Sequence, residues 1–225
     1  QFNGSSGYEE AASQGILAGI NAGLKCQGRE PMIIDRSEGY LGVLVDDLVT
    51  KENTEPYRMM TSRSEYRLLL RQDNADQRLT KKGYEVGLIN EERYQRLLKK
   101  EELIKNEIER VEHANVGANE KVQTLLKECG STPLSSGSTI AELIRRPELT
   151  YDMLKPIDDA RPDFPKNLAE EVAEQVNICI KYAGYITRQM RQVEQFKKLE
   201  RKKIPEDIDY DKVNSLRIEA IQKLK

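Results

Sequence analysis

The chain has 225 residues, with 36 Lys and Arg against 38 Asp and Glu, a formal net charge of −2 and a charged fraction of 33%. Its single histidine argues against a Ser-His-Asp triad and histidine-rich metal sites, and its three cysteines lack a CxxC spacing, which indicates reduced thiols in the cytosol. No apolar run approaches the ~18 residues that a membrane span needs, and the Trp-free, aliphatic composition favours a mainly α fold.

The first predicted element is a helix that runs through Leu24. Ser6 and Glu9 have the S-x-x-E spacing of a capping box at its start. Glycines recur at every fourth position along it, at Gly15, Gly19 and Gly23. Each glycine costs roughly 1 kcal/mol relative to alanine inside a helix. We therefore expect one face of this helix to lie close to another backbone or to a ligand.

The middle of the chain is harder to assign from its pattern. The apolar run 40–45 favours a strand or loop, and the aspartate pair 46–47 could do acid/base work only if burial raised a pKa. Ser62 and Glu65 have the spacing of a second capping box. The following residues, 66–71, are compatible with a helix or with a buried strand.

Helical periodicity dominates the remainder of the chain. Helices are expected from a cap at 73–76 towards residue 84, over 90–114, over 120–129, over 168–203 and over 210–225, with a helical turn at 139–145. Three prolines between residues 148 and 165 indicate a linker or irregular segment there.

A Gly/Ser-rich turn opens the first predicted helix and is the first candidate site. Ser5, Ser6, Gly7 and Tyr8 form this turn. Such a turn presents unpaired backbone N–H groups and the positive end of the helix dipole to an anion or an electron-rich ring. The alternative is an ordinary capped helix.

Arginines and tyrosines cluster in the second candidate site. The cluster contains Arg58, Arg63, Arg67, Arg71 and Arg78, with Tyr57, Tyr66 and Tyr84. On a helix, the arginines at 63, 67 and 71 would form one basic stripe. Arginine forks bind phosphates, and tyrosine rings stack on unpaired bases. The alternative is a solvated charged face, or ion pairs with aspartates 46, 47 and 73.

The segment 181–203 is the third candidate, with eight basic residues against two acidic ones. Tyr182 and Tyr185 are interleaved with the basic residues, as expected of a surface that follows a phosphate backbone. The alternative is that the basic residues only complement the dipole at the end of a helix. His113 is interpreted as a surface or capping residue, and the three cysteines are interpreted as packing residues.

Five collinear blocks of the sequence resemble the glucose-inhibited division protein A family. The blocks are residues 1–15, 39–50, 55–80, 143–154 and 180–189, and the TSRSEYR motif at 61–67 is the most specific of them. Members of this family are flavin-dependent tRNA uridine 5-carboxymethylaminomethyl modification enzymes.

The resemblance implies a domain organisation. Residues 1–75 would be the C-terminal remnant of an α/β FAD-binding domain, and 76–225 an α-helical tRNA- and partner-binding domain with subregions 76–165 and 166–225. It also implies that the chain is the later part of a longer enzyme, whose dinucleotide-binding turn and redox cysteines lie upstream. We therefore assign no catalytic residue and no metal ligand, and expect this chain by itself to be inactive.

The resemblance also assigns binding residues. Gln1, Ser5, Ser6, Gly7, Tyr8 and Glu9 match positions at the FAD site. Arg58, Arg63, Arg67 and Arg71 match a block on the tRNA or flavin-side surface. Lys181, Tyr182, Tyr185, Arg188 and Gln189 match a tRNA-contacting helix face.

The activity implied by the resemblance needs a partner GTPase, FAD, NADH and methylene-tetrahydrofolate. Together they would add a (carboxymethyl)aminomethyl group to carbon 5 of the wobble uridine in the tRNA anticodon region. A homodimer in the cytoplasm is expected. The alternative is a purely structural helical module for dimerisation or GTPase docking without RNA contact. A generic flavin oxidoreductase tail is disfavoured, because it gives the TSRSEYR block no role.

Overall fold

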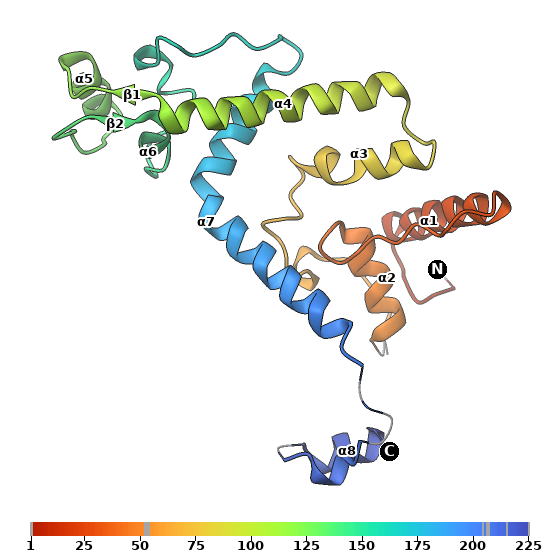
Figure 1. Ribbon diagram of the computed structural model, residues 1–225. Helices are drawn as coiled ribbons and strands as arrows, with labels where there is room; N and C mark the ends of the chain where they lie inside the picture. The colour runs from red at the N-terminus through yellow and green to blue at the C-terminus, as the bar shows by residue number, and fades with distance from the viewer. Residues whose placement is uncertain (1, 52–54, 204, 206–207, 215, 225) are drawn as a thin grey trace. The chain divides into compact units, whose positions relative to one another are not determined.

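The computed structural model describes residues 2–51, 55–203, 205, 208–214 and 216–224. In this described part the chain is mainly α-helical, which confirms the predicted fold class (Figure 1). It divides into two compact units, residues 1–189 and 190–225. Each unit is described by itself below.

The first helix, α1 (Tyr8–Cys26), is present where the pattern predicts it, but its start differs. Its N-cap is Gly7, with no side-chain hydrogen bond, so the predicted capping box of Ser6 and Glu9 is wrong. The glycines at 15, 19 and 23 would each have open space around an added Cβ, with no described atom within 4 Å apart from the neighbouring backbone of the helix itself. The expected close contact to this face is therefore not made by the described part of the chain.

The segment expected to be a strand or loop is a helix, α2 (Tyr40–Thr50). It buries Val43, Leu44 and Asp47, which recur at helical spacing on one face. An added Cβ at Gly42 would stand 2.3 Å from the carbonyl oxygen of residue 35, so the start of this helix packs directly on backbone. A six-residue apolar run is too short to reveal this from periodicity.

No helix forms over residues 66–71, so the predicted basic stripe is wrong. A short 3₁₀ turn, η1 (Thr61–Arg63), is followed by irregular turns. The second capping box is also wrong, because Met60 precedes η1 and has no side-chain cap. The Ser64 hydroxyl instead accepts a 3.1 Å hydrogen bond from the Tyr66 N–H, which stabilises a tight turn.

Helices and two very short strands make up the remainder of the first unit. They are α3 (Ala75–Glu85), α4 (Glu91–His113), β1 (Asn115–Val116), α5 (Glu120–Glu128), β2 (Ser138–Thr139), α6 (Ile140–Ile144), η2 (Lys155–Ile157) and the first part of α7 (Ala169–Glu200). β1 and β2 pair antiparallel, with Asn115 opposite Thr139 and Val116 opposite Ser138. The helices expected at 73–84, 90–114, 120–129 and 168–203 are confirmed.

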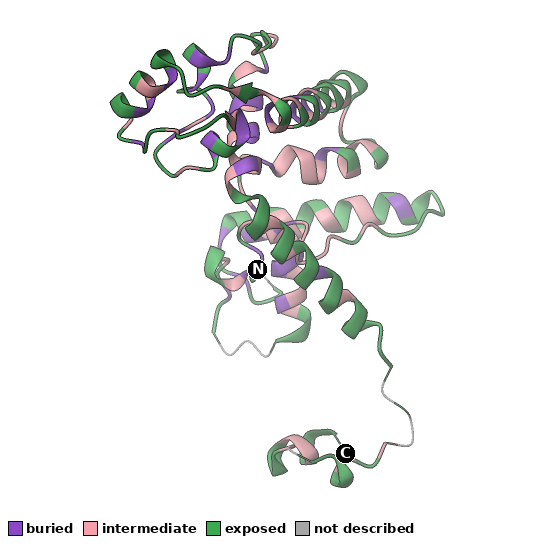
Figure 2. Ribbon diagram, turned by 60° about the vertical axis from the view of Figure 1, so that its left-hand side comes forward, coloured by how far each residue is buried: buried purple, intermediate pink, exposed green. Residues whose placement is uncertain are grey.

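The main hydrophobic core of this unit lies among α4, α5, α6 and the start of α7. The proline-containing segment 148–165 contributes Leu149, Tyr151 and Leu154, each at most 1% exposed. This segment is therefore irregular, as expected, but it is part of the core and not a linker. Buried residues are purple in Figure 2.

The second unit contains the end of α7, the 3₁₀ turn η3 (Tyr210–Lys212) and α8 (Ile218–Leu224). One continuous helix over 210–225 is therefore wrong. The Asp209 side chain accepts a hydrogen bond from the Asp211 N–H at 3.1 Å, and this local turn replaces the first part of the expected helix.

Candidate functional site

The N-terminal turn of α1 and the arginine-tyrosine block, far apart in sequence, lie side by side. The Tyr57 N–H donates to the Gly4 carbonyl at 2.7 Å, and the Ser6 N–H donates to the Tyr57 carbonyl at 3.3 Å. Ser5 and Tyr57 form an isolated parallel bridge. The structure thus joins two of the three candidate sites into one.

Glu10 links the two segments through its side chain, and nothing in the sequence pattern singled it out. Its Oε1 accepts a 2.8 Å hydrogen bond from the Met59 N–H and lies 3.3 Å from the Arg58 guanidinium. The Met59 N–H, followed by other hydrogen bonds and the charge of Arg58, lowers the pKa of this carboxyl against the opposing effect of desolvation. Its Oε2 is buried without a hydrogen-bond partner among the described residues and faces Gly7.

The predicted cofactor residues divide into supporting and outward-facing ones. Ser5 and Gly7 are buried, and the Ser5 hydroxyl accepts from the Gln14 amide at 2.8 Å. Ser6, Tyr8 and Glu9 are exposed at the helix start. The first N–H groups of a helix have no partner within it, and the N-cap residue Gly7 has no side chain that could accept from them. Gln1 lies outside the described residues.

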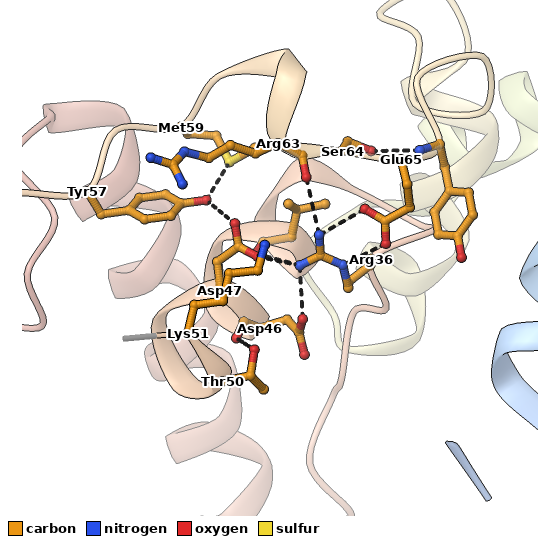
Figure 3. Close-up of polar contacts among 12 residues, drawn as sticks. Arg36, Asp46, Asp47, Thr50, Lys51, Tyr57, Met59, Arg63, Ser64 and Glu65 are labelled. Carbon is orange, nitrogen blue, oxygen red and sulfur yellow. Dashed lines mark hydrogen bonds and ion pairs between the residues drawn. The ribbon is translucent and has the colours of Figure 1, made fainter. Parts of the chain in front are cut away.

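A cluster of charged residues centred on Arg36 lies next to this site (Figure 3). The sequence pattern did not reveal it. Its Nε and Nη2 each lie 2.8 Å from a carboxylate oxygen of Glu65, a bidentate pair. Its Nη1 contacts Asp47 at 2.6 Å and Asp46 at 2.9 Å. Arg36 therefore ties the loop before α2 to α2 itself and to the TSRSEYR segment.

Asp47 has no solvent exposure, and the groups that donate to it include three side chains. Besides Arg36, these are the Lys51 ammonium at 2.7 Å and the Tyr57 hydroxyl at 2.8 Å. Burial alone raises the pKa of Asp47, but the three hydrogen bonds outweigh it, and the pKa lies below its ordinary value. The aspartate pair is thus not set up for acid/base work at residue 47, because this carboxylate is held ionised.

The four arginines of the predicted tRNA block have different surroundings. Arg58 and Arg67 are exposed, and the Arg63 guanidinium lies 4.2 Å from the centre of the Tyr57 ring. Arg71 pairs with Asp73 at 3.1 Å, which confirms the ion-pair alternative for this residue. The other two aspartates of that alternative pair with Arg36 instead of the block.

The residues of the third candidate, on α7, also differ in their surroundings. Tyr182 and Tyr185 are 44% and 63% exposed, and Arg188 is exposed one further turn along the helix. The Lys181 ammonium instead donates to the carbonyls of Arg146 and Pro147, both at 3.1 Å, just after α6. Lys181 therefore has a structural partner, whereas the other three can meet a ligand.

The described residues also include His113 and the side-chain types that bind metal ions. His113 is exposed, and its Nδ1 lies 2.8 Å from the Glu109 carbonyl, which confirms its surface position. Over these same positions, no group of three or more His, Cys, Asp and Glu residues could hold a metal ion. The helices that the structure describes include none with the length and hydropathy to cross a membrane.

Three family models match the chain and account for most of it. Their descriptions are tRNA modifying enzyme MnmG/GidA C-terminal helical domain (residues 91–190), tRNA modifying enzyme MnmG/GidA C-terminal helical bundle (192–225) and Glucose inhibited division protein A (1–30). The helical fold is thus of the class found at the C-terminal end of tRNA-modifying enzymes. The chain belongs to the glucose-inhibited division protein A (GidA/MnmG) family, which confirms the resemblance seen in the sequence.

Individual relatives agree with this assignment. Proteins named tRNA uridine 5-carboxymethylaminomethyl modification enzyme MnmG from Lachnoclostridium phytofermentans and Caldicellulosiruptor saccharolyticus are 63% and 56% identical over 224 residues, all of this chain. The chain spans about a third (35%) of the length of each. A crystal structure of Aquifex aeolicus GidA superposes with a TM-score of 0.74 at 43% identity, covering 99% of this chain and 34% of that one.

Proposed function

We propose that this chain acts within a flavin-dependent tRNA-modifying enzyme that adds a (carboxymethyl)aminomethyl group to carbon 5 of the wobble uridine. The observation that carries the proposal is the 63% identity, along the whole chain, to a relative named for this modification. By itself the chain is not expected to catalyse, because no catalytic side chain is assigned to it.

In this proposal residues 1–75 belong to the FAD-binding domain and 76–225 to the helical tRNA- and partner-binding domain, with subregions 76–165 and 166–225. The separate family models for 1–30 and 91–190 support a boundary between the two domains, whereas the models themselves divide the helical part near residue 191 and not near 165. The shared backbone hydrogen bonds of Gly4, Ser6 and Tyr57 support placing residues 1–30 and the TSRSEYR region together.

The N-terminal turn of α1 fits one edge of a FAD site. Its uncapped N–H groups suit an electron-rich ring or an anion, and Ser6, Tyr8 and Glu9 face outward, while Ser5 and Gly7 shape the turn. Arg58 adds a cation beside the turn. Bound FAD would supply the redox chemistry, with NADH and methylene-tetrahydrofolate as co-substrates. The part of this chain is to hold and orient the cofactor.

The exposed face of α7 is the proposed contact to the tRNA anticodon region. Tyr182 and Tyr185 offer rings for base stacking, and Arg188 offers a guanidinium for a phosphate. Exposed Arg58 and Arg67, with half-buried Arg63, extend a basic surface on the same unit. A partner GTPase, a homodimer and a cytoplasmic location complete the proposal.

The internal hydrogen bonds of Lys181 favour the competing view, a structural module without RNA contact. Salt-dependent tRNA binding to the whole enzyme separates the two. Arg188→Ala should weaken binding by about fivefold to tenfold and reduce the salt slope by about one unit, and Lys105→Ala on the exposed side of α4 is the control of equal charge. Equal effects of the two substitutions would favour the structural module.

A further inference from the structure

The first turn of α1 depends on a distant segment for its position. The N-cap residue Gly7 has no side chain, and hydrogen bonds join the turn both to Gln14 of α1 and to residues 57–59. Gly4 and Ser6 bond to the backbone of Tyr57, and Glu10 accepts from the Met59 N–H. Residues 57–59 therefore supply the contacts of the turn that lie outside the α1 segment.

The ring of Tyr57 fixes that segment. Tyr57 is 1% exposed, and its hydroxyl donates to Asp47 Oδ2 at 2.8 Å (Figure 3). Burial and the adjacent carboxylate raise the pKa of Tyr57, so its hydroxyl remains a donor at neutral pH. The guanidinium of Arg63 covers the ring. The hydroxyl also contacts the Met59 sulfur at 3.5 Å, so Asp47 on α2 is its charged partner and its shorter contact.

Asp47 is a stable anchor because its charge is compensated. A buried carboxylate is tolerated only when it is paired and hydrogen-bonded, and Arg36 and Lys51 supply the opposite charges at 2.6 and 2.7 Å. Arg36 is in turn fixed by the bidentate contact to Glu65. The anchor thus connects α2 and the TSRSEYR segment to the turn through Tyr57.

The same arrangement occurs a second time, away from the turn. Tyr151, 1% exposed, donates to Glu107 Oε1 at 2.7 Å, and Arg110 pairs with that carboxylate at 2.6 Å. The guanidinium of Arg161 lies 3.7 Å from the centre of the Tyr151 ring. This cluster joins α4 to the segment 148–165 through contacts that do not involve the turn, so it provides a matched control.

We infer that Asp47 is a positioning residue for the cofactor: acting through Tyr57, it holds the N-terminal turn of α1 in the place where that turn meets the flavin. The inference rests on the proposed FAD site. Small displacements of binding groups have large effects on cofactor geometry. Asp47 itself touches no cofactor.

The test compares Tyr57→Phe with Tyr151→Phe in the FAD-loaded enzyme that carries this chain. Each variant loses one buried tyrosine-carboxylate hydrogen bond, so both should lower the thermal midpoint to a similar extent. Tyr57→Phe should also weaken FAD binding about tenfold and shift the visible absorption band of the flavin. Tyr151→Phe should change neither. Equal flavin affinity and spectra in the two variants would overturn the inference.

Amide exchange in the 225-residue chain supplies a readout that needs no flavin. The Ser6 N–H should exchange about tenfold faster in Tyr57→Phe and in Asp47→Asn, and at the wild-type rate in Tyr151→Phe. Wild-type exchange at Ser6 in Tyr57→Phe would overturn the inference while leaving the proposed function intact. If the wild-type enzyme binds no FAD, the proposed cofactor role is wrong. The exchange rate of the Ser6 N–H would then be the measurement that decides whether Asp47 holds the turn in place.

Discussion

The carboxylate of Glu10 fills the space beside the α-carbon of Gly7. A Cβ on residue 7 would stand 1.8 Å from Glu10 Oε2 and 3.1 Å from Arg58 Cζ. The φ angle of Gly7 is −91°, which any residue can adopt, so the need for glycine comes from this close approach alone.

Gly7→Ala should therefore displace the Glu10 carboxylate and break its hydrogen bond to the Met59 N–H. We expect the thermal midpoint of the chain to fall by about 2–4 °C. Gly15→Ala is the control, because its added methyl meets open space in the described chain and should stabilise α1 by about 0.5–1 kcal/mol. Thermal unfolding of both variants measures this, and a rise for Gly7→Ala would contradict the packing.

Substitutions of Lys181 and Arg188, both on α7, should separate an effect on stability from an effect on RNA binding. Lys181→Ala removes two hydrogen bonds to the carbonyls of Arg146 and Pro147 and should cost about 1 kcal/mol of unfolding free energy. Arg188→Ala should leave the free energy of unfolding within about 0.5 kcal/mol of the wild-type value. Urea denaturation of each variant is the measurement. Equal stability of the two variants would show that the Lys181 contacts contribute nothing.

The buried Lys100 should respond asymmetrically to loss of its partners. Its side chain is 2% exposed, while Asp76 and Glu171, at 2.8 and 2.9 Å, are 31% and 40% exposed. Lys100→Met leaves two carboxylates that water can reach and should cost about 1 kcal/mol. Joint Asp76→Asn and Glu171→Gln substitution leaves a buried, uncompensated ammonium and should cost about 3–5 kcal/mol. Similar losses in urea denaturation would contradict this.

Asp47 should affect how the free energy of unfolding falls at acid pH. Its pKa in the folded chain lies below the ordinary value of about 3.9, so the unfolded state binds this proton more tightly. Its contribution is fully present above that ordinary value and is lost as pH falls through the folded pKa. Asp47→Asn should lower the unfolding free energy at pH 7 by about 3 kcal/mol and flatten its decline as the pH falls below about 4. An acid slope equal to that of the wild type would refute this.

Long amphipathic helices were predictable because their apolar positions repeat over several turns. α4 and α7 are examples, and each begins within a few residues of its predicted start. α2 was not predictable, because its helix is decided by the contact of Gly42 with the backbone of residue 35 and by the ionic contacts of Asp47.

The candidate site was predictable only as segments. The turn at 5–9 and the arginine block were each identified, but their junction through Tyr57 depends on tertiary pairing that no local pattern encodes. Arg36 has no periodic or motif signal, and its role exists only because loops bring Glu65 and Asp47 to it. The prediction of a basic stripe was wrong because residues spaced by four share one face only where a helix forms.

The most direct test of the proposed activity is nucleoside mass spectrometry of the wobble position after incubation of unmodified tRNA. The reaction would contain the enzyme that carries this chain, the partner GTPase with GTP, FAD, NADH, methylene-tetrahydrofolate as the one-carbon donor and an ammonium salt as the source of the amine nitrogen. We expect conversion of the wobble uridine to its 5-aminomethyl-type derivative, and joint Tyr182→Ala, Tyr185→Ala and Arg188→Ala substitution should greatly reduce that conversion. Unchanged uridine with the wild-type enzyme, under conditions in which the Lachnoclostridium phytofermentans relative modifies the same tRNA, would contradict it.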